Sequence, residues 1–280
     1  MPILLRSACS VRSSRLLPGS APSDRTALQA VRVLAGLCAV SWLVFPGFGV
    51  IDLSVTWSAD WPQVLEAGWG LFATVIVGAA FVLVGVRPLG SAPAVAQLVI
   101  ATVALAISAV FAKEGRLLAL VALLALQTAI VSALLRRARP GGRDFWQPRP
   151  VGVSRPLLVV ACAGVVPWLS YALQMWALNR AGRSDSDITI GVDHYSVQGA
   201  LALSLGLLPL LAALRAEVRP FVPVCASVAA FYLGLVSLAW PNSPGGLSRT
   251  WSAAAVAWAL VLAAVALARR RRTAPLAQLS

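Results

Sequence analysis

Eight continuous apolar runs of about twenty residues dominate the chain. A helix rises about 1.5 Å per residue, so each run can cross the roughly 30 Å hydrocarbon core of a bilayer. With 59% hydrophobic and 12% charged residues, the 280-residue chain has too little polar surface to enclose a water-soluble core. We therefore predict an all-α integral membrane protein with eight transmembrane helices, at residues 30–52, 64–86, 92–112, 117–135, 156–178, 195–214, 221–240 and 250–268.

The two halves of the chain share a spacing pattern. Asp60 precedes the second run and Arg136 follows the fourth, while Asp193 precedes the sixth and Arg269 follows the eighth. Both intervals are 76 residues, which is typical of two parallel four-helix repeats related by an axis along the membrane normal. The alternative is that any series of similar helices and short loops produces such spacing.

These patterns predict five segments. The first 29 residues are rich in Ser and Arg and lack the apolar stretch of a secretory signal, so we expect a disordered tail. The expected order is a disordered cytoplasmic tail at 1–29, a first four-helix half at 30–136, a basic cytoplasmic loop at 137–155, a second four-helix half at 156–268 and a cytoplasmic tail at 269–280.

Basic residues indicate the orientation. Cytoplasmic loops of membrane proteins carry an excess of Lys and Arg, so the arginine-rich tails and middle loop favour a plasma membrane protein with both termini in the cytoplasm. The net charge of +13 is spread between apolar runs, which argues against nucleic acid as a partner. The expected partners are the lipid bilayer and anionic headgroups near the cytoplasmic arginines, and protein partners stay open.

Polar residues gather in "SDSDITIGVDHYSVQG", which contains the only histidine, His194. Asp193 directly precedes the sixth run, where a carboxylate can cap unpaired backbone N–H groups. Asp60 occupies the equivalent place in "DWPQ", which has the D-x-x-Q form of a capping box. We expect both aspartates to cap their helices, and the alternative for Asp193 is a polar site shared with His194.

A candidate binding pocket extends from this stretch. His194 and Gln198 are four residues apart and share a helix face, and polar groups at membrane depth require partners. The alternative is a histidine that faces only headgroups and water. The candidate binding residues are Asp193, His194, Gln198, Gln174, Tyr171 and Asn179, with Glu66 from the other half.

Several chemistries lack their sequence signatures. One histidine with no adjacent cysteine argues against zinc, and "DSDITIG" places its glycine one position too late for a calcium loop. The chain has no phosphate-binding or dinucleotide motif, so we expect no metal and no cofactor. No acid lies deep within a predicted span, which argues against an ion-coupled transporter.

The segment "QMWALNRAGRSDSDITIGVDHYSVQGALAL" resembles uncharacterised multi-pass membrane proteins of actinobacteria. In these proteins an Asn-Arg pair, an acidic loop and a D-H-[WY]-x-x-Q run join two helices. The resemblance implies a membrane location and a recurring motif on the outer face. It implies no activity, substrate or catalytic residue.

Three classes of function remain. We favour a membrane-embedded binding or transport-related protein with an outer-face polar pocket. The alternatives are an outer-face enzyme on a lipid-linked substrate, with Asp193 and His194 as acid and base, and a non-catalytic subunit of an envelope complex. The observation that discriminates between these classes is whether Glu66, Asp193, His194 and Gln174 converge on one cavity.

Overall fold

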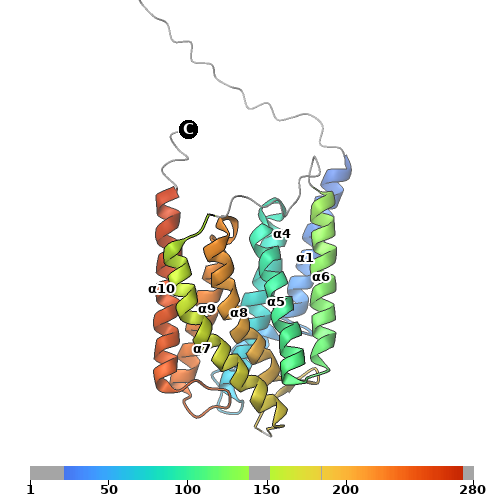
Figure 1. Ribbon diagram of the computed structural model, residues 1–280. Helices are drawn as coiled ribbons and strands as arrows, with labels where there is room; N and C mark the ends of the chain where they lie inside the picture. The colour runs from blue at the N-terminus through green and yellow to red at the C-terminus, as the bar shows by residue number, and fades with distance from the viewer. Residues whose placement is uncertain (1–21, 139–151, 184, 274–280) are drawn as a thin grey trace, which may run out of the picture.

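A computed structural model of the protein describes residues 22–138, 152–183 and 185–273 as a bundle of helices (Figure 1). Within this part of the chain, eight helical segments are long and apolar enough to cross a membrane. The predicted all-α, multi-pass membrane fold is therefore confirmed.

The spanning segments follow one another along the chain with short connections. They are α1 (Pro22–Leu43), a continuous segment made of α3 (Gln63–Leu71), the π-helical η1 (Phe72–Gly78) and α4 (Ala79–Val86), then α5 (Ala92–Ala112), α6 (Leu117–Arg137), α7 (Arg155–Arg180), α8 (His194–Leu214), α9 (Val222–Ala239) and α10 (Arg249–Thr273). Shorter elements are α2 (Gly49–Val55), the single turns η2 (Pro88–Gly90) and η3 (Ala216–Val218), and an antiparallel pair of strands, β1 (Ile188–Thr189) and β2 (Val192–Asp193).

The first span differs from its prediction. One helix was expected at 30–52, but α1 ends at Leu43 and a separate short helix, α2, begins at Gly49. Pro46 in "FPGFG" cannot donate a helical hydrogen bond, and Phe48 has a positive φ of 54°, so the chain turns here. The expected disordered tail at 1–29 is wrong over residues 22–29, which form the start of α1.

The other boundaries lie close to the predicted spans. Arg137 belongs to α6 and Arg155 begins α7, so both ends of the expected loop at 137–155 are helical. Residues 139–151 of that loop lie outside the described residues, as do 1–21, 184 and 274–280. The helix α10 continues to Thr273, which places the start of the expected tail at 269–280 within a helix.

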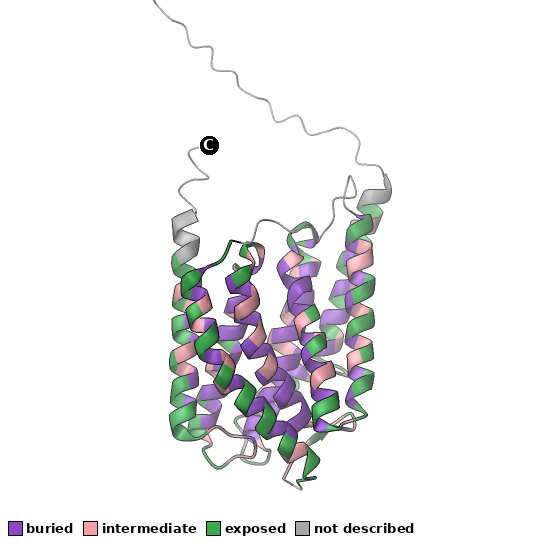
Figure 2. Cartoon of the chain, in the orientation of Figure 1, coloured by how far each residue is buried: buried purple, intermediate pink, exposed green. Residues whose placement is uncertain are grey.

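Burial divides the helices into a central and a peripheral set (Figure 2). Within the apolar 18-residue stretch of each span, between 56% and 72% of the residues are buried in α3–α4, α5, α8 and α9, whereas between 28% and 33% are buried in α1, α6, α7 and α10. In each half of the chain the second and third spans are therefore central, and the first and fourth are peripheral. The parallel repeat predicts this order, and the repeat itself stays a prediction.

The two ends of the bundle differ in what they carry. The start of α1 and the end of α10 lie at the same end, which we call the terminal end (Figure 1). We call the opposite end, formed by the connections at 56–62, 113–116, 181–193 and 240–248, the distal end. Glu66 and His194 lie near the distal end, because both are close to the first residue of a helix that begins there.

The two predicted helix caps have different outcomes. Asp193 is the N-cap of α8, and its side chain accepts a hydrogen bond of 2.9 Å from the Tyr195 N–H, which confirms that prediction. The capping box at Asp60 is wrong, because α3 begins only at Gln63 and its N-cap is Pro62. Asp60 is exposed, and its carboxylate accepts a hydrogen bond from the Ser58 hydroxyl instead.

Candidate functional site

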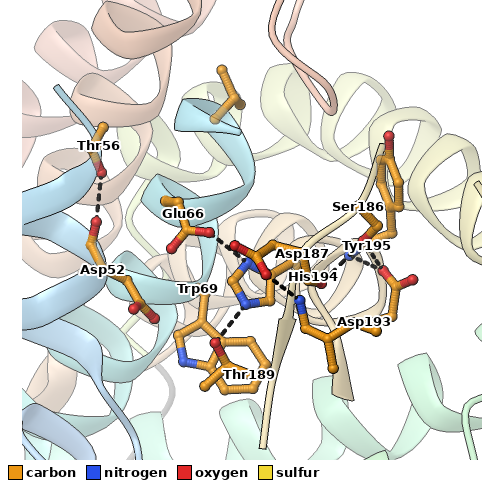
Figure 3. A network of polar contacts seen from close by, with 12 residues as sticks. Asp52, Thr56, Glu66, Trp69, Ser186, Asp187, Thr189, Asp193, His194 and Tyr195 are labelled. Atoms are coloured by element: carbon orange, nitrogen blue, oxygen red, sulfur yellow. Dashed lines mark hydrogen bonds and ion pairs between the residues drawn. The ribbon is translucent and has the colours of Figure 1, made fainter. Parts of the chain in front are cut away.

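Four titratable side chains meet beneath the distal end (Figure 3). They are Asp52 of α2, Glu66 of α3, Asp187 of the connection between α7 and α8, and His194 of α8. We call these four residues the acid–histidine cluster. Its members come from separate segments of the chain, so tertiary packing assembles them.

The closest contact in the cluster joins the two halves of the chain. Glu66 Oε1 lies 3.5 Å from His194 Nδ1, and the two side chains are 3% and 0% exposed. The Gln198 side chain of α8 lies close to the backbone of α3 at Gly68. A Cβ added to Gly68 would be 1.2 Å from Gln198 Oε1. Gly68, two residues after Glu66, therefore leaves room for the Gln198 side chain.

The imidazole of His194 is held on several sides. Its Nε2 lies 2.9 Å from Thr189 Oγ1 of β1, and its backbone N–H donates to the Asp187 carbonyl at 3.1 Å. The Trp69 ring stacks on the imidazole with centroids 4.8 Å apart, and Trp69 Nε1 donates to the Gly47 carbonyl. The ring of His194 is thus fixed by both α3 and the hairpin that precedes α8.

Asp187 and Asp52 add negative charge to the same region. The Asp187 carboxyl contacts that of Glu66, and such a contact is favourable only when a proton or a cation lies between the two groups. Asp52 is 6% exposed. Burial, together with the negative charge of Asp187, raises the pKa of Asp52 to about 7.

The cluster contains polar atoms that the described part of the chain does not satisfy. Asp52 Oδ2, Glu66 Oε1 and His194 Nδ1 are buried and have no hydrogen-bond partner there. Within the same described residues, no Lys or Arg forms an ion pair with Asp52, Glu66 or Asp187. Three acids therefore share the site with one histidine and no permanent positive charge.

Two arginines stabilise the 181–193 connection. Arg116 Nη1 donates to the Gly191 carbonyl at 3.0 Å, between the two strands of the hairpin. Arg183 pairs with Asp185, and the hydrogen bond from this guanidinium lowers the pKa of Asp185. Both arginines hold the connection that covers the cluster.

Asp193, the residue beside His194, does not join the cluster. Its carboxylate accepts from Ser186 Oγ at 2.5 Å and from the Tyr195 N–H. Burial raises the pKa of Asp193, and these two hydrogen bonds oppose that shift. The Asp193 and His194 side chains therefore have separate partners, and only His194 contacts Glu66.

The predicted residues of α7 have three different environments. Tyr171 is buried and accepts a hydrogen bond of 2.7 Å from Gln198 Nε2, while its own hydroxyl donates to the Gly245 carbonyl. Gln174 is exposed on the outer side of α7. Asn179 Nδ2 donates to the Ala112 carbonyl at the end of α5. The structure therefore brings together Glu66 with His194 and Tyr171 with Gln198, and it leaves Gln174 and Asn179 apart.

Asp52, Asp187, Thr189 and Trp69 were not among the site residues predicted from the sequence. Asp52 had a detectable signal, since it is a carboxylate beside an apolar run that "FPGFG" interrupts. Asp187 and Thr189 belong to a polar connection with many candidates, and only the hairpin selects them. Trp69 is one of 10 tryptophans, and its role depends on the contact with His194.

The chemistry of the cluster is that of an anionic, buried site. Carboxylates and a neutral imidazole accept hydrogen bonds and bind protons or cations. Among the described residues, no group of three or more His, Cys, Asp and Glu has an arrangement that could hold a metal ion. Comparison of the chain with protein-family models, curated proteins and solved structures finds no match.

Proposed function

We propose that this chain is a membrane-embedded binding protein of the transport-related class, and that its acid–histidine cluster binds a small ammonium-type cation. One observation carries the proposal. Three buried polar atoms, Asp52 Oδ2, Glu66 Oε1 and His194 Nδ1, have no hydrogen-bond partner in the described chain and lie among three carboxyl groups with no basic counter-charge.

The cost of burying carboxylates without a partner favours a positively charged ligand. A buried carboxylate without a partner loses its hydration and gains nothing in return, whereas a paired one recovers part of that cost. An ammonium group carries one positive charge and up to three or four N–H donors, so it can satisfy several acceptors at once. A ligand of this class complements both the charge and the hydrogen-bonding needs of the cluster.

Access to the site depends on the hairpin between α7 and α8. Asp187 and Thr189 lie on this hairpin, on the distal side of the cluster. Asp187 contacts Glu66, Thr189 contacts His194, and His194 is fully buried. A ligand from the distal side can therefore reach the cluster only if the hairpin moves. Arg116, which bonds the Gly191 carbonyl, holds the hairpin closed.

The proposal is tested by exchanging salts on the purified protein. In a buffer of constant ionic strength, replacing sodium chloride by methylammonium chloride should raise the midpoint temperature of unfolding of the wild type. Glu66→Gln and Asp52→Asn should remove this increase, because each deletes a buried carboxylate. Asp60→Asn is the matched control, since Asp60 is an exposed acid at the same end. Equal responses of all four proteins would contradict cation binding at the cluster.

We further propose that the distal end faces the outside of the plasma membrane, with both termini in the cytoplasm. The supporting observation is the concentration of arginines in the tails and middle loop, which membrane proteins retain on the cytoplasmic side. In a variant without native cysteines, a cysteine at Ala59 of the distal end should react with an impermeant thiol reagent in intact cells. A cysteine at Gly90 of the terminal end should react only after lysis, and the reverse result would invert the orientation.

The enzyme hypothesis receives less support from the same contacts. It required Asp193 and His194 to act together as acid and base on a lipid-linked substrate. Their side chains form hydrogen bonds with different residues: Asp193 with Ser186, and His194 with Thr189. The pair that could exchange a proton is Glu66 and His194, and the hairpin covers it.

A further inference from the structure

A groove runs between α7 and α10 on the side of the bundle, away from the acid–histidine cluster. Its volume is about 430 Å³, and it is lined by Ala163, Gly164, Val166, Pro167, Trp168, Ser170, Tyr171, Gln174, Leu247, Trp251, Ala254, Ala255 and Trp258. Both flanking helices are peripheral spans, and Val166 and Trp251 at its edges are 69% and 54% exposed. The groove therefore opens sideways, toward the lipid that surrounds a membrane protein.

The lining changes in polarity along the groove. Gln174 lies six residues before the distal end of α7, and Trp251 lies two residues after the start of α10. The deeper part is apolar and aromatic, with Trp168 and Trp258 in an edge-to-face contact at 5.9 Å between centroids. A polar part near the distal end and an apolar part deeper in the membrane match the order of groups in a lipid whose headgroup is at the distal interface.

The polar part of the groove has unsatisfied hydrogen-bonding groups. Ser170 and Gln174 are exposed on a membrane-spanning helix, and neither side chain has a hydrogen bond within the described part of the chain. Pro167 has no N–H, so the Ala163 carbonyl lacks its usual helical donor. Polar groups at this depth are costly in hydrocarbon and need a partner.

We propose that this groove is a binding site for one lipid of the distal leaflet. Its ester and glycerol oxygens accept hydrogen bonds from Ser170 and Gln174, and one acyl chain lies along Val166, Ala254 and Trp258. The lipid explains both the unsatisfied polar groups and the apolar lining below them. This site is independent of the cation site, because none of its residues belongs to the acid–histidine cluster.

The proposal is tested by photocrosslinking in phosphatidylglycerol bilayers that contain a trace of the same lipid with a diazirine in its acyl chain. Cross-links should concentrate on Val166, Ala254 and Trp258. The control surface is α6, an equally peripheral span, with Leu118 and Leu126 exposed to lipid. Equal labelling of α6 and the groove would overturn the proposal.

Two variants identify the contacts that hold the lipid. Ala254→Trp fills the groove and should abolish its labelling, while Leu126→Trp on α6 should leave it unchanged. Gln174→Leu should lower labelling about threefold, the change expected for one hydrogen bond in a membrane. Gln174 is exposed, so this variant is expected to fold, and unchanged labelling in both Gln174→Leu and Ala254→Trp would contradict the site.

Discussion

Helices α3 and α8 both begin at the distal end, and each supplies one partner of the Glu66–His194 contact, but their first turns are stabilised differently. At the start of α8 the cap is local, because Asp193 accepts from the Tyr195 N–H two residues later. At the start of α3 the Val64 N–H donates to Ser243 Oγ, which belongs to the connection between α9 and α10. A local cap can be recognised in the sequence, whereas a cap from a distant segment cannot.

The surroundings of the two helix starts extend this difference. The preceding hairpin covers the first turn of α8, and its Thr189 and Asp187 contact His194. The first turn of α3 packs against the connection that follows α9, where a Cβ on Gly245 would lie 2.6 Å from Leu65. Glu66 is therefore positioned by long-range packing, whereas His194 is positioned by the segment next to it together with Trp69 of α3.

The largest expected effect comes from breaking the pair that joins these two helices. Glu66→Leu or His194→Leu removes one side of the 3.5 Å contact between these two buried side chains and should lower the free energy of unfolding by about 3 kcal/mol. The double variant should be more stable than the sum of the two losses predicts, because it removes both polar groups together. Denaturant unfolding of the four proteins measures this coupling, and strictly additive losses would show that the contact has no energetic role.

A second prediction concerns the acidic side of the cluster, where Asp52 faces Asp187 and Glu66. The pKa of Asp52 rises from 3.8 to about 7 in the folded protein, so the folded state binds more protons than the unfolded state between these values. This contribution to stability is present at low pH and is lost as the pH rises through that window, with no further change above it. The midpoint temperature of unfolding should therefore fall by several degrees across the window, at about 2–4 °C per kcal/mol.

The variant Asp52→Asn should remove this part of the pH dependence, because an amide does not titrate. Asp60→Asn should retain it, since Asp60 is exposed and outside the cluster. Thermal scans of the three proteins across the same window make the comparison. Parallel pH profiles for the wild type and Asp52→Asn would show that Asp52 is not the titrating group.

The sequence predicted the spanning helices well because their signal is continuous and local. The predicted segment at 92–112 has the bounds of α5, and the helix start at Asp193 was identified from one capping residue. The break after Leu43 was less predictable, because a short helix resumes at Gly49 within the same apolar run. Apolarity alone does not distinguish one long helix from two.

The candidate site was only partly predictable for a related reason. Glu66 and His194 were both selected, since an acid and a histidine are rare near apolar runs. Their contact depends on the packing of α3 against α8 and on Gly68, which the sequence does not specify. Asp193 was grouped with His194 because they are neighbours in the chain, but adjacent residues at a helix start direct their side chains to different partners.

A third prediction compares the two caps directly. Asp193→Ala and Ser243→Ala should each lower the free energy of unfolding by about 1 kcal/mol, because each removes an acceptor from a helix N-terminus. Ser243→Ala should act on α3, although the residue is far from that helix in the sequence. Hydrogen exchange of the first-turn amides, Val64 for one variant and Tyr195 for the other, locates each effect. Unchanged exchange at Val64 in Ser243→Ala would mean that Ser243 does not cap α3.

The smallest expected effects separate a real cap from a residue that only occupies the equivalent position. Asp60→Ala should change the free energy of unfolding by less than about 0.5 kcal/mol, because Asp60 is exposed and, within the described residues, its side chain accepts a hydrogen bond only from Ser58. Asp193→Asn should also be nearly neutral, because Asn and Asp cap helices about equally well, so the charge of Asp193 contributes little. Denaturant unfolding of both variants beside Asp193→Ala completes the test. A loss of about 1 kcal/mol in Asp60→Ala would restore the capping box and make the two helix starts alike, whereas the same loss in Asp193→Asn would assign the charge itself a role.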